Sequence, residues 1–236
     1  LMRNHKEMRY LVTPAAVVWS VGVVVADQTR GAAKPRQAIG LDAAPGPRMA
    51  SRTKPLLVVM VLGETARAAN WGLSGYSRQT TPELATLPVI NFAQVSSCGT
   101  NTEVSVPCMF APVGRRDYDE GLIRGSESLL HVAARAGVGV HWRDNQSGCK
   151  GVCEGLPQDE VNQLKEAAAL CTEGRCLDEG LLLGLPERIT ALAATAPAQA
   201  GTQLLVLHML GNHGPSYFRR YPPAFERFKP ACQKDD

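Results

Sequence analysis

The chain has 236 residues, of which 44% are hydrophobic and 20% charged, so it can bury a core and is neither disordered nor fibrous. The net charge of +3 is uneven, because residues 1–54 hold nine Lys and Arg against three Asp and Glu, whereas residues 55–236 are mildly acidic. The folded body lacks the basic, aromatic-bearing stripe of a nucleic-acid binder, so we expect no nucleic-acid partner. The basic N-terminal arm favours an anionic membrane surface.

The first 54 residues are expected to precede the main folded body. Residues 11–26 are uncharged, but this stretch is short for a membrane span, which needs about 20 residues. It is compatible with a signal peptide or with an interfacial segment. Residues 28–54 are rich in Ala, Gly, Pro and Arg without hydrophobic periodicity, which predicts a linker.

From residue 55 onward, predicted strands alternate with predicted helices. In chain order we expect a strand buried on both faces at 56–62, a Ser-capped helix at 126–136 ended by Gly137, a strand at 138–142, a helix at 177–194 interrupted by Pro186, and a buried strand at 203–209. This alternation predicts an α/β fold with a mostly parallel sheet. In such folds the functional residues lie beyond the carboxyl ends of the strands.

Seven cysteines are present, and six fall in close pairs. The pairs are Cys98 with Cys108, Cys149 with Cys153, and Cys171 with Cys176, while Cys232 is left over. Short spacings in loops favour disulfides, which persist in an oxidising compartment such as the periplasm. A structural zinc site is the weaker alternative, because no pair has C-x2-C spacing. A redox site at Cys149 and Cys153 is weaker still, since their spacing is C-x3-C.

Polar residues follow the predicted strands or occupy Gly-rich loops between them. They supply a carboxylate, a hydroxyl, an amine and an imidazole at Glu64, Thr102, Lys150 and His213. Such a set suits metal-assisted transfer of an anionic group.

Each of these residues also has a simpler explanation. Glu64 and either Thr100 or Thr102 could cap helices, Lys150 could be a solvated lysine, and the His213 side chain could bond its own loop. His208 lies within an apolar strand, so we expect it to pack in the core.

A series of motifs makes one family recognisable. These are VLGETAR (61–67), WGLSGYSR (71–78), TTP (80–82), SCGTNT (97–102), SVPCMF (105–110), WRDN (142–145), SGCKGVC (147–153), DEG (178–180) and HMLGNHGP (208–215). Together they resemble the catalytic domain of lipid A phosphoethanolamine transferases, which belong to the alkaline phosphatase/sulfatase superfamily and include the colistin-resistance enzymes. The resemblance covers residues 54–232, and its order and spacing make it specific.

The resemblance implies a role for each matching residue. Thr102 matches the nucleophile, and Glu64 with Thr102 matches zinc ligands. The substrate-binding residues are Lys150 and His213, together with Asn145 or Gln146, because relatives have Asp-Asn-Asn where this chain has Asp-Asn-Gln. The disulfides are Cys98–Cys108, Cys149–Cys153 and Cys171–Cys176.

The implied fold is an α/β/α sandwich that carries a zinc-dependent, two-step reaction. Thr102 takes phosphoethanolamine from phosphatidylethanolamine and passes it, through a phosphothreonine, to a lipid A phosphate, which gives polymyxin resistance. The implied protein is a monomer on the periplasmic face of the bacterial inner membrane. Residues 1–27 become a membrane-proximal segment after a transmembrane domain, residues 28–54 a linker, and residues 55–236 the N-terminal part of the catalytic domain.

Two departures from the family bear on activity. The family's transmembrane helices would precede Leu1, and the chain stops before a Ser-Asp-His-Gly-Glu stretch that supplies further zinc ligands. Zinc needs about four ligands, so we expect this chain alone to bind zinc weakly and to turn over poorly. A different acceptor, another superfamily hydrolase or transferase, and a catalytically silent module remain as alternatives.

Overall fold

The computed structural model describes residues 17–18, 20–21, 35–194, 201–214 and 216–233. The chain divides into two compact units between Arg36 and Gln37, and the fold described below is that of the second unit. The apolar segment at 11–26 lies almost wholly outside the described residues. Within the described residues, no helix has both the length and the hydropathy to cross a bilayer.

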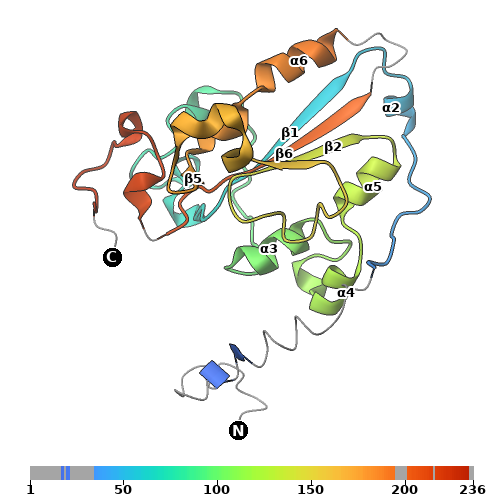
Figure 1. The fold of residues 1–236 in the computed structure, drawn as a ribbon, viewed down its shortest axis with the longest axis horizontal. Coiled ribbons are helices and arrows are strands. Elements are labelled where there is room, and N and C mark those ends of the chain that lie inside the picture. Colours follow the sequence, from blue (N-terminus) through green and yellow to red (C-terminus); the bar gives the residue numbers. More distant parts are fainter. Residues whose placement is uncertain (1–16, 19, 22–34, 195–200, 215, 234–236) are drawn as a thin grey trace. The chain divides into compact units, whose positions relative to one another are not determined.

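A four-stranded parallel sheet forms the centre of the fold, with strand order β1-β6-β2-β3 (Figure 1). Its strands are β1 (Leu56–Leu62), β2 (Gly139–Asp144), β3 (Gln158–Glu160) and β6 (Thr202–His208). The three predicted strands are confirmed to within two residues at each end. The sequence did not predict β3, because its three residues, Gln-Asp-Glu, carry no apolar pattern. The predicted parallel α/β fold is confirmed.

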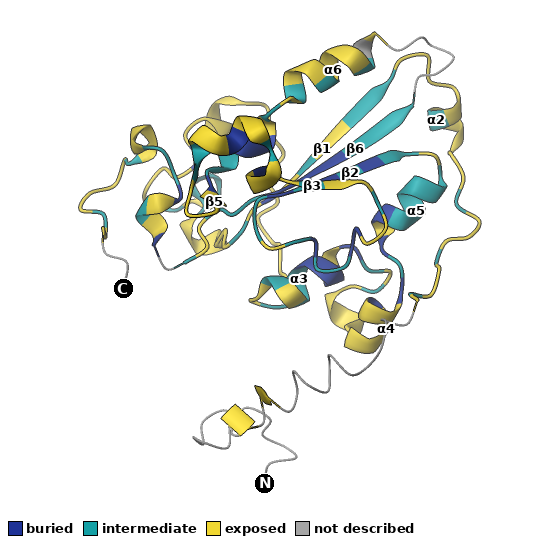
Figure 2. Ribbon diagram, viewed as in Figure 1, coloured by how far each residue is buried: buried dark blue, intermediate teal, exposed yellow. Residues whose placement is uncertain are grey.

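Apolar clusters cover both faces of the sheet. Along β6, Leu204 and Val206 belong to one cluster, and Leu205 and Leu207 belong to the other, because successive side chains of a strand point to opposite faces. The first cluster includes residues of α3 (Thr102–Met109) and α5 (Leu129–Arg135), and the second includes residues of η8 (Asp178–Leu182) and α6 (Leu185–Ala193). The result is the expected α/β/α sandwich, and its buried residues are dark blue in Figure 2.

The strand β1 corrects one expectation. It was predicted to be buried on both faces, but Val58, Val59 and Val61 are 40%, 41% and 56% exposed. The physical reason is that β1 lies at the edge of the sheet in the described part of the chain and pairs only with β6. An apolar run predicts a strand, but it does not show which elements pack against its two faces.

The helix predicted at 126–136 begins later than expected. Ser128 caps α5, with its Oγ accepting from the Leu130 N–H at 3.1 Å. The His131 Nδ1 accepts from the Ser128 N–H at 3.1 Å and completes a reciprocal capping arrangement. Gly137 follows the helix with φ of 82°, as the sequence predicted.

The helix predicted at 177–194 is in fact two elements. A 3-10 helix, η8, is separated from α6 by Gly184, which has φ of 68°. Pro186 lies in the first turn of α6 and therefore does not interrupt a helix. A first-turn N–H has no intrahelical partner to lose, so proline is well tolerated there.

The remaining elements are short and fill the connections. They are α2 (Pro47–Ala50), α4 (Glu120–Gly125), the antiparallel pair β4 (Cys171–Thr172) and β5 (Arg175–Cys176), and the 3-10 helices η2 (Ala68–Asn70), η3 (Gly72–Ser74), η4 (Leu84–Thr86), η5 (Arg115–Asp117), η6 (Val161–Gln163), η7 (Lys165–Leu170), η10 (Tyr217–Arg219) and η11 (Pro223–Phe225). Gln37, which lies within the predicted linker, contacts the folded body, because its N–H donates to Gly125 O at 2.7 Å.

All three expected disulfides are present. Cys98–Cys108 spans the start of α3, Cys149–Cys153 lies in the loop after β2, and Cys171–Cys176 closes the β4–β5 hairpin. Cys232 is free and exposed.

Candidate active site

Parallel pairing brings the ends of three strands side by side. Leu62 of β1 and Asp144 of β2 both pair in register with His208 of β6. The pairing continues beyond the strands, because the Met209 N–H donates to Leu62 O at 3.0 Å and the Asn145 N–H donates to His208 O at 2.9 Å. The polar loops that follow β1, β2 and β6 therefore begin at one edge of the sheet, as expected for an α/β fold.

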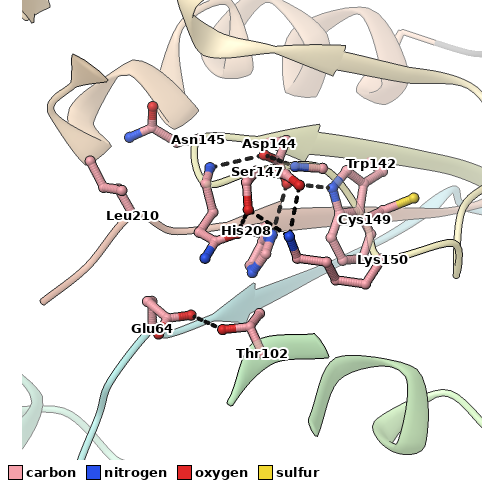
Figure 3. A network of polar contacts seen from close by, with 12 residues as sticks. Glu64, Thr102, Trp142, Asp144, Asn145, Ser147, Cys149, Lys150, His208 and Leu210 are labelled. Carbon is pink, nitrogen blue, oxygen red and sulfur yellow. Dashed lines mark hydrogen bonds and ion pairs between the residues drawn. The ribbon is translucent and has the colours of Figure 1, made fainter. Parts of the chain in front are cut away.

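Thr102 and Glu64 form the centre of the site. Thr102 is the first residue of α3, and its Oγ1 donates to Glu64 Oε2 at 2.7 Å (Figure 3). The cap of this helix is Asn101, whose Oδ1 accepts from the Val104 N–H at 2.9 Å. The alternative in which Thr100 or Thr102 caps the helix is therefore wrong. Because its neighbour serves as the cap, the Thr102 hydroxyl is left to face the carboxylate.

Glu64 is held as an anion by its neighbours. The Thr65 Oγ1 donates to Glu64 Oε1 at 2.8 Å, and His213 Nδ1 lies 3.7 Å from the same oxygen. Burial by itself raises the pKa of Glu64, but the hydrogen bonds from Thr102 and Thr65, with the nearby His213, outweigh it and leave that pKa below its ordinary value. Glu64 does not act as a helix cap.

Gly211 allows the loop after β6 to approach Glu64. This glycine has φ of 50°, and a Cβ atom added to it would lie 2.7 Å from Glu64 O. A larger residue would therefore be strained and would clash with the backbone. The close approach places His213 beside the carboxylate.

Lys150 is not a solvated surface lysine. Its side chain is 9% exposed, and its Nζ lies 3.1 Å from Glu103 Oε1. The same Nζ donates to Ser147 O at 2.8 Å. Glu103 directly follows Thr102, so the ammonium of Lys150, a residue of the loop after β2, lies next to the first turn of α3.

The two candidate amides have different environments. Asn145 Nδ2 donates to Asp178 Oδ1 at 2.8 Å and to Cys176 O at 3.0 Å, so both of its amide hydrogens have protein acceptors. The Gln146 Oε1 accepts from Ser147 Oγ at 2.6 Å, while its Nε2 bonds to no residue that the structure describes. Both residues line a cavity of about 200 Å³ together with His213.

Asp178 is a residue of the site that the sequence reasoning did not identify. Besides Asn145, it accepts from the N–H groups of Leu210 at 2.8 Å and Gly211 at 2.9 Å. One carboxylate thus joins the loop after β2, the β4–β5 hairpin and the loop that carries His213. The available signal was its place in the DEG motif, two residues after a paired cysteine.

A second carboxylate–imidazole pair lies in the core beside the site. His208 Nδ1 lies 2.8 Å from Asp144 Oδ1, and the Trp142 Nε1–H donates to that oxygen at 3.1 Å. The other oxygen accepts from the N–H groups of Gln146 and Gly148 at 2.9 and 2.8 Å (Figure 3).

Hydrogen bonding keeps Asp144 ionised despite its burial. Burial raises the pKa of Asp144, but the hydrogen bonds from His208, the Gly148 N–H and Trp142 outweigh it and leave the pKa below its ordinary value. The expectation that His208 packs in the core is confirmed, since it is 1% exposed. Its pairing with Asp144 was not foreseen.

Glu64 and Thr102 are the predicted zinc ligands. A carboxylate and a hydroxyl 2.7 Å apart offer oxygen donors of a kind that zinc accepts, but a structural or catalytic zinc usually has four ligands. In the described part of the chain, no three His, Cys, Asp or Glu residues gather closely enough to hold a metal ion. The described residues therefore fit a zinc ion in donor type and supply only part of its ligand set.

Comparisons with known proteins identify the family of this chain. The sulfatase family profile matches residues 57–236. Phosphoethanolamine transferase EptA of Escherichia coli K12 is 40% identical over all of this chain, and phosphatidylethanolamine transferase Mcr-1 of Escherichia coli is 39% identical over 99% of it. The chain spans 42% and 43% of these relatives, respectively, which is less than half of their length.

Solved structures show the same similarity. The integral membrane lipooligosaccharide phosphoethanolamine transferase EptA of Neisseria meningitidis matches with a TM-score of 0.81 and 39% identity, covering 100% of this chain and 42% of that one. The soluble domain of the Neisseria meningitidis enzyme matches with a TM-score of 0.75 and 42% identity, covering 86% of this chain and 58% of that one. This chain therefore belongs to the sulfatase family, and the relatives it resembles within that family are phosphoethanolamine transferases.

Proposed function

We propose that this chain carries the nucleophile of a phosphoethanolamine transferase. In this proposal Thr102 takes phosphoethanolamine from phosphatidylethanolamine, releasing diacylglycerol, and passes it to a phosphate of lipid A. The observation that carries the proposal is the 2.7 Å hydrogen bond from Thr102 Oγ1 to Glu64 Oε2 at the N-terminus of α3. The names of relatives at 39–40% identity support the chemistry.

In the first transfer step, four residues around Thr102 have separate roles. Glu64 accepts a hydrogen bond from the Thr102 hydroxyl. This bond orients a lone pair of Thr102 Oγ1 away from the carboxylate and toward an incoming phosphorus atom. Lys150, which contacts Glu103, and His213, which lies beside Glu64, place positive charge or hydrogen-bond donors where the transferred phosphoryl group develops negative charge. The Nε2 of Gln146 has no partner among the described residues, so it is available to bind the phosphoethanolamine group.

Zinc is part of the proposal. When bound by Glu64 and Thr102 with ligands beyond the described residues, it would lower the pKa of the Thr102 hydroxyl and so favour the alkoxide. The oxygen donors of Glu64 and Thr102 support this role, although the described residues supply only part of the ligand set that zinc needs.

The proposed location is the periplasmic face of the inner membrane, where the donor phospholipid is available. Three disulfides support an oxidising compartment. The transferred group adds an ammonium to an anionic acceptor, which weakens the attraction between that acceptor and cationic peptides. Polymyxin resistance is the expected consequence.

The test is the replacement of Thr102 in the complete gene product, expressed in a bacterium whose lipid A carries no phosphoethanolamine. We expect Thr102→Ala to abolish addition of phosphoethanolamine to lipid A, measured by mass spectrometry of the extracted lipid. Thr100→Ala, two residues away in the same loop, is the matched control and should retain the modification. Modified lipid A in cells with Thr102→Ala would refute the nucleophile assignment, and modification of a different glycan by the wild type would refute the acceptor.

A further inference from the structure

Two arginines from distant parts of the chain line the same two cavities. Arg175 lies in β5, and Arg220 follows η10. Both line the cavity of about 200 Å³ that His213 also lines. Both also line an adjoining cavity of about 350 Å³, whose other lining residues include Leu170 and Leu177. The arginines therefore stand between a small polar chamber at the active site and a larger, more apolar one.

Arg175 is presented by a short stapled hairpin. It pairs with Thr172 across the β4–β5 ladder, the turn residues Glu173 and Gly174 have φ of 52° and 76°, and the Cys171–Cys176 disulfide closes the hairpin. Within the described residues, the Arg175 side chain forms no hydrogen bond or ion pair. The backbone of this arginine is fixed, while its guanidinium donors remain available.

Arg220 is buried and connected to the catalytic loop. It is 8% exposed, and its Nε donates to His213 O at 2.8 Å. This bond uses one edge of the guanidinium and holds the loop that brings His213 to 3.7 Å from Glu64. A group bound by Arg220 would therefore lie next to the loop that completes the Thr102 centre.

Charged groups of both signs surround the cavity. Burial lowers the pKa of Arg220, and the positive charges of Arg175 and Arg219 lower it further, while Asp178 raises it. Three carboxylates line the cavity or lie near it, and each already has donors. Asp144 and Glu160 line it; Asp144 accepts from four donors, and Glu160 accepts from Gln163 Nε2 at 3.1 Å. The nearby Asp178 accepts from Asn145 and two backbone N–H groups. The positive charge of Arg175 acts on Arg220, and an anion bound between the two guanidinium groups would offset that repulsion.

We infer that this cavity is a phosphate subsite in which Arg175 and Arg220 bind the phosphate group of the acceptor. The planar guanidinium donors match phosphate oxygens in geometry. The volume of about 200 Å³ is below the roughly 300–1,000 Å³ of pockets that hold drug-sized ligands, so it suits one small group. The adjoining chamber has room for part of the molecule that bears the phosphate.

The assignment to the acceptor rests on the proposed function. In the first half of that reaction, one phosphate group must reach Thr102. In the second half, an acceptor phosphate must approach a phosphothreonine, so two anionic groups come together and need additional positive charge. Arg175 and Arg220 can supply it close to the Thr102 centre, because His213 borders both their cavity and Glu64.

The first experiment measures binding directly. The complete gene product is titrated with inorganic phosphate and with glucosamine 1-phosphate by calorimetry, with uncharged glucosamine as the ligand control. We expect Arg175→Ala to weaken binding of both phosphates by about tenfold or more, because hydrogen bonds to charged groups are lost. Arg115→Ala, which removes an exposed arginine outside both cavities, should leave binding unchanged. Undiminished phosphate binding by Arg175→Ala would overturn the subsite.

The second experiment separates the two half-reactions. We expect Arg175→Ala to form the phosphothreonine from phosphatidylethanolamine at the wild-type rate but to show a KM for lipid A raised by about tenfold. Arg175→Lys keeps the positive charge but loses the planar guanidinium donors, so its KM for lipid A should lie between those of the wild type and Arg175→Ala. Slower phosphothreonine formation in Arg175→Ala would assign the cavity to the donor and overturn the acceptor assignment. If the wild type formed no phosphothreonine, the proposed function would fail, while the phosphate titration would still decide the subsite.

Discussion

Two carboxylate–imidazole pairs lie at the ends of neighbouring strands, and they differ in burial. The side chains of Asp144 and His208 are 5% and 2% exposed, and their closest polar atoms are 2.8 Å apart. The side chains of Glu64 and His213 are 13% and 51% exposed, and the corresponding distance is 3.7 Å. The same residue types at the same edge of one sheet therefore occupy very different environments.

The difference separates a saturated, buried pair from an open, partly exposed one. The two oxygens of Asp144 accept from four donors, so the pair is saturated and fixes the loop after β2. Glu64 is bonded to two hydroxyls and lies beside an exposed imidazole, so its partners can exchange when a substrate or an ion arrives. A saturated buried network gives rigidity, whereas the open pair can take part in chemistry.

The largest expected effect on stability comes from breaking the buried pair. Asp144→Ala should lower the free energy of unfolding by about 3–5 kcal/mol, because it leaves His208, Trp142 and two backbone N–H groups without their acceptor in the core. Urea denaturation at pH 7 measures the change. Asp42→Ala, at an exposed turn, is the control and should stay within about 0.5 kcal/mol of the wild type. A loss below about 1 kcal/mol for Asp144→Ala would show that the pair is not structural.

The open pair should show the opposite balance. Glu64→Gln should change the free energy of unfolding by less than about 1 kcal/mol, because the amide keeps one oxygen acceptor at a partly exposed position. It should also abolish phosphoethanolamine transfer, because the Thr102 hydroxyl loses its anionic partner. The measurement combines urea denaturation with the lipid A assay. Transfer retained by Glu64→Gln would contradict the role given to this carboxylate.

Acid should affect the two pairs to different degrees. The pKa of Asp144 is lowered from 3.8, so its ionised form stabilises the fold above that pH, and this contribution is lost as pH falls through the lower pKa of the folded state. The difference in unfolding free energy between wild type and Asp144→Asn should be constant from neutral pH to about pH 5 and should shrink on further acidification. The corresponding difference for Glu64→Gln should be small throughout. A difference for Asp144→Asn that grows in acid would have the wrong sign.

The sequence alone determined much of the fold and of the site. Apolar runs located β1, β2 and β6 because a buried strand needs a continuous apolar segment. The rule that functional residues follow the carboxyl ends of parallel strands pointed to Glu64 and His213, and their closest polar atoms are 3.7 Å apart. The motifs around Thr102 and Lys150 identified the family, and the cysteine spacing with that resemblance gave the three disulfides.

The tertiary structure decided between residue roles that local sequence patterns cannot distinguish. Asn101 and Thr102 are both residue types that cap helices well. Only the tertiary structure shows that Asn101 is the cap and that the Thr102 hydroxyl bonds to Glu64. Asp178 acquires its role from donors in two distant loops, and Arg175 meets Arg220 only where a hairpin and the chain after His213 border the same cavities. The apolar run of β1 does not reveal that three of its valines are exposed. In each case the contact joins residues far apart in the chain, and only strand register and loop packing bring them together.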